Sequence, residues 1–422
     1  MKLLKPGLAA LCLVLSGCHK TDEAAPLKIQ YVEIWADGLN KTFEQICREW
    51  ATANGRKVEF SRVSLDDLPQ RTAEFIEVRG AADLAIIPAT DAVIHQNVLR
   101  PMNDVLGQYQ SQGHVPISIA VDMNYAAGNW VAVPIYSWSH VWFWRADRLK
   151  EAGLKPPRTL QEAKLVMQAL RNKKDNTYGF GIGLGGDDDS KMFTQAVLWS
   201  FGASVFDKNG RVVLDSPQTR AAFAYVLSLQ RDGLLPDGVM GWDGASNNRA
   251  FLDGSIDGTA NAPTILYAAN RLNKTLANNI DVTLYPEGPA GRHTFATGFS
   301  LAIRRDNPRA AECADLIQFI LRDENYARLI EAAEGSVNPQ YSGFDRLKIW
   351  SDPRLRVALD SLQYEHPVGW PGPVTRSAAE VFDRHVLTDV YGRVLNDKLS
   401  LDDAITEATR KVEAIVQRNA GK

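Results

Sequence analysis

The stretch that most constrains the fold is Asn129–Asp147, in which two apolar, strand-like runs meet at Pro134. It holds four of the ten tryptophans of the chain: Trp130, Trp138, Trp142 and Trp144. Proline removes a backbone donor and fixes φ, so we expect one strand to end near Pro134 and another to begin after it. This pattern predicts a crossing between two structural units, with a ligand-binding site close to it.

Length and charge limit the class of protein. A chain of 422 residues is too long for one ordinary core, which favours two domains. The composition, 45% hydrophobic and 23% charged, is typical of a soluble globular protein. A formal net charge of −3 lacks the basic field that a general nucleic-acid binder needs, so no nucleic-acid partner is expected.

The first residues have the pattern of a secretory signal. Lys2 and Lys5 precede a short apolar run, Leu8–Leu15, which cannot span a bilayer and predicts a signal peptide over residues 1–17. The following Leu-Ser-Gly-Cys18 resembles a bacterial lipobox, in which cleavage leaves a lipidated cysteine. We therefore expect a periplasmic or extracytoplasmic protein that Cys18 anchors to the membrane through a polar tether, residues 18–26. The alternative is ordinary signal cleavage nearby, with Cys18 uninvolved.

Two cysteines remain in the predicted globular part, Cys47 and Cys313. An oxidising compartment permits a disulfide between them. Both lie on helical patterns, however, and a free buried cysteine behaves as a small hydrophobe. We favour two buried thiols over a disulfide.

Strand-like and helix-like segments alternate along the first part of the chain. Lys28–Ile34 is alternating and β-branched, and residues 43–50 have the spacing of an amphipathic helix. Asp83–Pro88 is a continuous apolar run, typical of a buried parallel strand. This alternation predicts a doubly wound α/β unit.

Several motifs, in their order and spacing, resemble those of the extracellular solute-binding proteins of ABC transporters, in the carbohydrate-binding group that includes the maltose-binding protein. The departures are of like character, such as Trp142 and Trp144 in place of tyrosines. The resemblance spans essentially the whole chain after the signal. The matching segments are Trp130–Pro134, Val141–Leu149, Ala152–Glu162, Phe251–Gly254, Thr297–Ser300, Pro308–Glu324 and Asp402–Val416.

The resemblance implies two α/β lobes of the type II-like periplasmic-binding-protein fold, joined by a hinge, with ligand in the cleft between them. By this analogy the first lobe is 27–133 plus 286–320, the second is 134–283 plus 324–422, and the first crossing lies at Val133–Pro134. The implied function is a lipid-anchored receptor that binds a mono- or oligosaccharide and delivers it to permease subunits. Such a protein is expected to be a monomer without catalysis or cofactor.

Sugar recognition needs aromatic platforms for ring faces and polar groups for hydroxyls. Asp91 leaves a buried strand where the maltose-binding protein has a hydroxyl-binding carboxylate; its alternative role is a helix N-cap. Trp138 replaces a ligand-contacting carboxylate of that protein, which favours stacking. Trp142 and Trp144 are assigned to the core. The ligand-binding candidates are Trp35, Asp37, Asp91, Tyr136, Trp138, His140, Gln195, Trp199, Trp242, Asn261, Thr264, Gly298, Trp370 and Arg376.

Each candidate also has a structural alternative. Trp35 and Asp37 lie on the first strand-to-helix loop, where a rim tryptophan and a helix cap are equally consistent with the pattern. His140 is as consistent with a structural histidine, and Trp199, which shares a helix face with Gln195, with core packing. For Arg376 the alternative is a surface salt bridge.

Other motifs are discounted. Residues 181–186 satisfy a GxGxxG pattern but run directly into three aspartates, 187–189, whose charge repels a pyrophosphate. The aspartates lack the spacing of a calcium loop, so no metal site is predicted. Two rival functions remain open: a secreted lipoprotein glycosidase or other hydrolase, and the same fold binding a glycerol phosphodiester, with Arg376 as the anion partner.

Overall fold

Parallel strands open the first sheet, as the alternating pattern predicts. The computed structural model describes residues 25–421, so the predicted signal peptide, Cys18 and most of the tether lie outside the described residues. The sheet has the order β11-β10-β3-β1-β2, and β6 pairs with β10 as well. Its strands are β1 (Leu27–Val32), β2 (Val58–Val63), β3 (Leu84–Pro88), β6 (Val133–Ser139), β10 (Thr294–Ala302) and β11 (Glu365–His366).

Helices cover both faces of this sheet, because the crossover from β1 to β2 and the one from β2 to β3 run in opposite directions along it. The helices of this lobe are α1 (Asp37–Ala53), α2 (Leu68–Glu77), α3 (Ala89–Ile94), α4 (Asn103–Ser111), α5 (Ser118–Asn124), α13 (Ala310–Ile320) and α14 (Asp323–Ala332). The buried face of α1 carries the spacing expected from the sequence, including Phe43 and Trp50. Trp50 Nε1 donates to Asp315 of α13 at 2.7 Å, which fixes one helix against the other.

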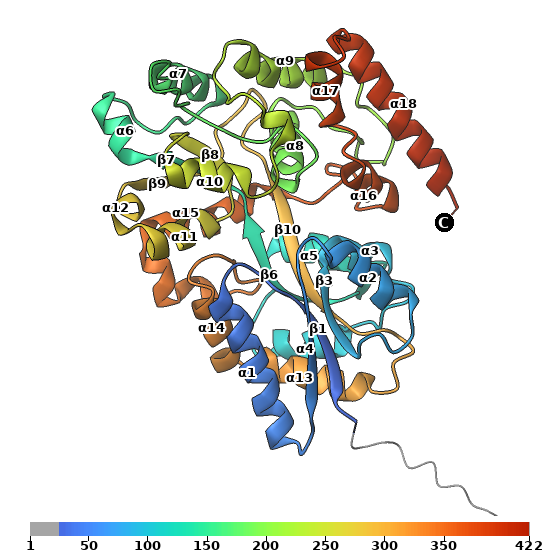
Figure 1. Cartoon of the computed structure of the whole chain (residues 1–422). Helices are drawn as coiled ribbons and strands as arrows, with labels where there is room; N and C mark the ends of the chain where they lie inside the picture. Colours follow the sequence, from blue (N-terminus) through green and yellow to red (C-terminus); the bar gives the residue numbers. More distant parts are fainter. Residues whose placement is uncertain (1–24, 422) are drawn as a thin grey trace, which may run out of the picture.

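The second lobe is built on a short antiparallel sheet, β8-β7-β9, and is mostly helical (Figure 1). Trp142 and Trp144 on β7 are both fully buried, which confirms their assignment to the core. Its strands and helices are β7 (Val141–Arg145), β8 (Gly258–Asn261), β9 (Ile280–Thr283), α6 (Ala146–Glu151), α7 (Leu160–Leu170), α8 (Asp188–Ser200), α9 (Pro217–Arg231), α10 (Ser246–Asp253), α11 (Thr264–Leu272), α12 (Lys274–Ala277), α15 (Pro353–Ser361), α16 (Arg376–Asp383), α17 (Asp389–Leu395) and α18 (Leu401–Asn419).

The first crossing differs from the sequence prediction. Pro134 does not separate two strands but lies inside β6, opposite a register shift in the β6–β10 ladder. The missing N–H is tolerated at this bulge. Buried hydroxyls satisfy carbonyls of β6: Tyr341 donates to Pro134 O at 2.8 Å and Tyr326 to Ile135 O at 2.7 Å. The strand therefore continues to Ser139, and the chain turns at His140 before β7.

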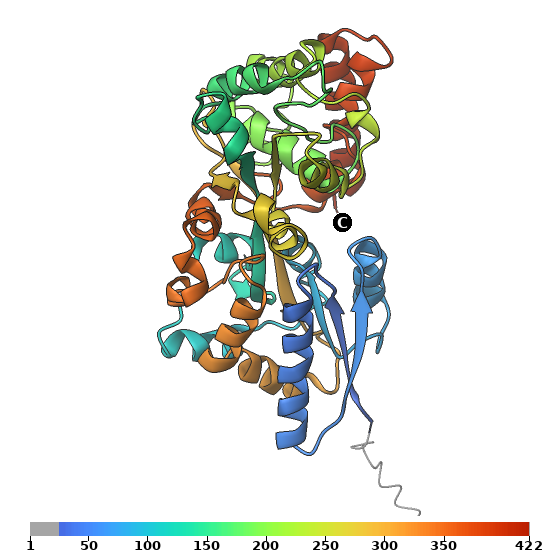
Figure 2. The ribbon, with the colours of Figure 1, turned by 60° about the vertical axis from the view of Figure 1, so that its left-hand side comes forward.

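Strands β6 and β10 run together from one lobe to the other (Figures 1 and 2). One expected lobe boundary needs correction. The sequence placed residues from 324 onward in the second lobe, but α14 packs against α1 of the first lobe, because the apolar face of α14, with Tyr326 and Ile330, belongs to the same core.

Cys47 and Cys313 are buried free thiols, as favoured from the sequence. Among residues 25–421, none of the helices has the length and apolar character needed to cross a bilayer.

Candidate functional site

A polar network centred on Asp189 joins three segments of the second lobe. Asp189 lies in the first turn of α8, whose N-cap is Asp187. Its Oδ1 lies 3.2 Å from His140 Nε2, and its Oδ2 accepts from Asn247 Nδ2 at 2.9 Å and from Asn261 Nδ2 at 3.0 Å. A carboxylate only accepts, so His140 Nε2 carries a proton. The network brings together the predicted residues His140 and Asn261, and Thr264 lies beside it, 3.5 Å from Asn261 Oδ1.

Asp189 itself was missed as a site residue. From the sequence, the 187–189 triplet suggested only a calcium loop, whose spacing it does not have. In the part of the chain that the structure describes, there is no group of three or more His, Cys, Asp or Glu side chains suited to a metal ion. The signal that identifies Asp189 is its position in the first turn of a helix whose buried face points into the lobe.

The aromatic residues of α8 and the late loop form a second cluster. Trp199 is 1% exposed and stacks on Phe295, with ring centroids 5.9 Å apart and an interplanar angle of 2°. The half-buried Trp370 meets Trp199 edge-on at 5.7 Å and stacks on His366 at 3.8 Å. Gln195 is buried on the same helix. This arrangement favours the core-packing alternative for Trp199 and leaves Trp370 as the more accessible member.

Tyr136 and Trp138 lie on β6, and both contact Phe299 of β10, at centroid distances of 5.5 and 4.9 Å. Tyr136 is fully buried, whereas Trp138 is half-buried. The Tyr136 hydroxyl and the Trp138 indole N–H are buried without a hydrogen-bond partner among the described residues. The accessible part of the Trp138 ring is suited to stack against a sugar ring.

Gly298 allows β10 to approach two helices closely. A Cβ there would stand 3.3 Å from Met123 Cε of α5 and 3.6 Å from the Cβ of Ala89, where α3 begins. Next to it, Thr297 pairs with Trp138 in the ladder and donates through Oγ1 to Met192 Sδ of α8 at 3.3 Å. Gly298 thus has a packing role, and the Thr297–Met192 contact joins β10 to a helix of the second lobe.

Asp91 meets charged groups of the second lobe. It lies in the first turn of α3, but the N-cap is Pro88, so the capping alternative does not hold. Burial raises the pKa of Asp91 to about 6; the Asp383 carboxylate raises it further, and the Arg376 guanidinium opposes the shift. Arg376 and Asp383 are the two ends of α16. In the same region Val374 packs against the apolar cluster of Ala92 and Val93, so the lobes touch here.

The remaining candidates are peripheral. Trp35 is 60% exposed, and Asp37 forms a 2.6 Å ion pair with Lys41. The N-cap of α1 is Ala36, so Asp37 adds charge to the first turn without capping it. Trp242 is half-buried and packs beside Ile256 of the second lobe, over Gly181.

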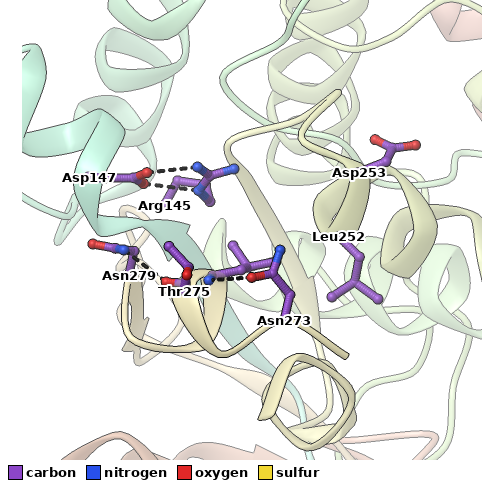
Figure 3. A pocket seen from close by; sticks show the side chains of 8 residues that line it. Arg145, Asp147, Leu252, Asp253, Asn273, Thr275 and Asn279 are labelled. Atoms are coloured by element: carbon purple, nitrogen blue, oxygen red, sulfur yellow. Dashed lines mark hydrogen bonds and ion pairs between the residues drawn. The ribbon is translucent and has the colours of Figure 1, made fainter. Parts of the chain in front are cut away.

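A separate cavity of about 200 Å³ opens in the second lobe (Figure 3). It contains none of the predicted ligand residues. Three of its polar side chains are already bonded: Arg145 binds Asp147 at 2.9 and 2.7 Å, and Asn279 Nδ2 donates to Thr275 O at 2.8 Å. These contacts are structural, so we do not assign the ligand to this cavity.

Comparison with known proteins identifies the class. The model of the bacterial extracellular solute-binding protein family matches residues 36–327. The chain therefore belongs to this family, which confirms the resemblance found in the sequence.

Individual relatives are distant. A protein of Brucella abortus (strain 2308), described as a binding protein, is 22% identical over 333 residues, covering 78% of this chain and 79% of its own. A Deinococcus radiodurans protein described as an ABC transporter-binding protein is 23% identical over 318 residues, covering 72% and 74%.

Solved structures show the same fold. A solute-binding protein from Thermotoga lettingae, bound to α-D-tagatose, has a TM-score of 0.81 at 16% identity and covers 93% of this chain and 100% of its own. The maltose-bound MalE3 of T. maritima has a TM-score of 0.76 at 20% identity, with coverages of 92% and 99%. An Agrobacterium radiobacter K84 protein in complex with ribitol has a TM-score of 0.78 at 17% identity, with coverages of 93% and 99%. These matches confirm the two-lobed fold.

Proposed function

We propose that this protein is the substrate-binding component of an ABC importer, that it binds a sugar or sugar alcohol between its lobes, and that it delivers the ligand to permease subunits. The observation that carries the proposal is Trp138, a half-buried ring on the strand that crosses between the lobes, whose indole N–H has no hydrogen-bond partner among the described residues. The polyhydroxylated ligands of the structural relatives, namely tagatose, maltose and ribitol, support this ligand class.

The ligand is proposed to contact both lobes. From the first lobe Asp91 would accept from hydroxyls and Trp138 would stack, while the Asp189 network would hold His140 and Asn261 in position in the second. Closure of the lobes around the ligand would then supply part of the affinity. Six further residues remain proposed as contacts at the edges of this site: Trp35, Asp37, Trp242, Thr264, Trp370 and Arg376. Four more are proposed to lie beneath it: Tyr136, Gln195, Trp199 and Gly298.

We further propose a monomer that a lipid on Cys18 anchors to the bacterial membrane on its extracytoplasmic side. The membership in an extracellular family supports the compartment. Replacing Cys18 with alanine should release the protein from the membrane fraction. A Cys18→Ala protein that stays in the membrane fraction would contradict the anchor.

The binding function is tested by a thermal-shift and calorimetric screen of residues 27–422 against monosaccharides, oligosaccharides and sugar alcohols. A ligand that binds only the folded state raises the midpoint of unfolding. We expect at least one compound to do so and to be recovered chemically unchanged. Product formation from oligosaccharides would instead favour a hydrolase. The absence of any shift across the panel would contradict the proposal.

The glycerol phosphodiester alternative has weaker support. Arg376 lies close enough to Asp91 to affect its pKa and stands on the same helix as Asp383, so two carboxylates already share its neighbourhood. Carboxylates repel a phosphate. If Arg376→Ala removed binding of a phosphodiester while sugars failed to bind, this alternative would replace the sugar proposal.

A further inference from the structure

A buried polar cluster lies where the chain crosses between the lobes. Ser139, at the end of β6, has three neighbours: Glu365 Oε1 of β11, the Ala358 carbonyl of α15 at 2.9 Å, and Asn338 Nδ2 at 2.6 Å. Ser139, Asn338 and Glu365 are all at least 95% buried. The cluster joins segments up to 226 residues apart in the sequence.

Hydrogen counting determines the protonation of Glu365. The Ser139 hydroxyl has one hydrogen, which it can donate either to Ala358 O or to Glu365 Oε1, but not to both. If Glu365 were a carboxylate, two acceptor oxygens would face each other in a buried site. If Glu365 carries the proton, its O–H donates to Ser139 Oγ, and Ser139 donates to Ala358 O. Each of the three contacts of Ser139, with Glu365, Ala358 and Asn338, then contains one hydrogen between its two heavy atoms.

The result does not depend on how the Asn338 amide is turned. Exchanging its oxygen and nitrogen would give Ser139 a third acceptor neighbour and would make the need for an added proton greater. Glu365 Oε2 and Asn338 Oδ1 are buried without a partner among the described residues. An unpartnered carbonyl oxygen of a neutral acid costs less to bury than an unpartnered carboxylate oxygen.

Charged groups on the surrounding elements are bonded elsewhere. On α15, Arg354 pairs with Asp352 and Arg356 with Asp360. Before β10, His293 Nδ1 lies 2.8 Å from Nε2 of His366, the neighbour of Glu365 on β11, so these two rings share one hydrogen. After β6, His140 is bonded to Asp189. Within residues 25–421 Glu365 forms no ion pair, and its carboxyl group is hydrogen-bonded to Ser139.

We propose that Glu365 is a carboxylic acid at neutral pH, that its proton joins β11 to β6 at the interlobe crossing, and that losing this proton at alkaline pH loosens the crossing. The inference concerns the ligand-free protein and goes beyond the binding function.

Burial supports the proposal. It raises the pKa of Glu365 to about 8, against the lowering effect of the Ser139 hydrogen bond. The folded-state pKa thus lies above the value of an unfolded glutamate, about 4.3. The contribution of Glu365 to stability is therefore fully present below pH ~4.3, falls as the pH rises toward 8, and is lost above it.

The test compares wild type with Glu365→Gln, which keeps the shape and a donor but cannot ionise. The unfolding equilibrium constant of ligand-free residues 27–422 is measured from pH 5 to 9. Relative to Glu365→Gln, the wild type should lose stability by up to about tenfold per pH unit between pH 5 and 8, and no further above 8. The exposed Glu59→Gln variant serves as the control and should follow the wild type. A constant difference between wild type and Glu365→Gln across the range would overturn the proposal.

A second measurement covers the case in which Glu365→Gln does not fold. Infrared spectroscopy of the wild type at pH 7 should show the carbonyl stretch of a protonated carboxylic acid, and this band should disappear by pH 9.5. The Glu59→Gln protein should show the same band. Its absence at pH 7 would mean that Glu365 is ionised, which contradicts the assignment. Because neither measurement uses a ligand, a failed sugar screen would leave this result unaffected.

Discussion

Asp189 Oδ1 lies 3.2 Å from His140 Nε2, and the other oxygen of the same carboxylate accepts from two asparagine amides. Asp189, in the first turn of α8, is thus hydrogen-bonded to three segments: the end of β8, the start of α10 and the turn between β6 and β7. The proposed ligand residues of the second lobe depend on it for their orientation.

Replacing Asp189 with asparagine should weaken ligand binding. The new amide would place its NH₂ group either against His140 or against the two asparagine amides, so at least one present donor would lose its acceptor. Losing one such buried hydrogen bond costs about 1–3 kcal/mol, which corresponds to roughly 5- to 150-fold in affinity if the site is displaced. Calorimetry with the ligand found in the screen measures this. The exposed Asp237→Asn serves as the control, and unchanged affinity in Asp189→Asn would rule out the positioning role.

Binding should depend on pH through Asp91. Its pKa is raised to about 6, first by burial. A protonated carboxyl is a poorer acceptor for ligand hydroxyls, so affinity should fall as the pH drops from 7.5 to 5, approaching about tenfold per pH unit below 6. Asp91→Asn should bind more weakly and without this dependence. The exposed Asp66→Asn should behave as the wild type.

The same group affects the stability of the ligand-free protein in the opposite sense. Because the pKa of Asp91 is raised on folding, its contribution is present below pH ~3.9 and is lost as the pH rises through about 6. Denaturation of wild type and Asp91→Asn between pH 4 and 7 measures it. If affinity and stability changed with pH in the same direction, Asp91 would not be the responsible group.

Trp138 and Trp199 should behave differently when each is replaced by phenylalanine. Trp138 is half-buried on the crossing strand, so losing its larger ring and its indole N–H should reduce affinity roughly tenfold. Trp199 packs in the core, so Trp199→Phe should bind normally, whereas Trp199→Ala should cost about 3–5 kcal/mol of unfolding free energy. Equal losses of affinity in the two phenylalanine variants would show that Trp199 contacts the ligand.

The two cysteines should be unreactive in the folded protein. Burial raises the pKa of the Cys313 thiol to about 12 and that of Cys47 well above its usual range. Since the thiolate is the nucleophile, a thiol reagent should modify neither in native residues 27–422 and both after unfolding, without added reductant. Fewer than two reactive thiols after unfolding would indicate a disulfide.

Features that depend on neighbouring residues could be predicted from the sequence, whereas features that depend on distant residues could not. Thr159 and Ser400 cap α7 and α18, and caps of this kind are encoded locally because they depend on residues three positions apart. Pro134 misled because the sequence shows a missing donor but not the irregularity in the β6–β10 pairing, at Ile135 of β6, that accommodates it. Asp189 was missed because its partners lie 49 and 72 residues away, beyond any local pattern.

The sequence by itself determined the alternation of strands and helices, the buried tryptophans of β7 and, through the order of its motifs, the family. These properties follow from local spacing, which periodicity and caps encode directly. Only the tertiary structure decided that α14 belongs with α1, that Trp199 packs on Phe295, and that Ser139 needs a proton from Glu365. The physical reason is that burial and hydrogen-bond satisfaction are properties of groups brought together from distant parts of the chain.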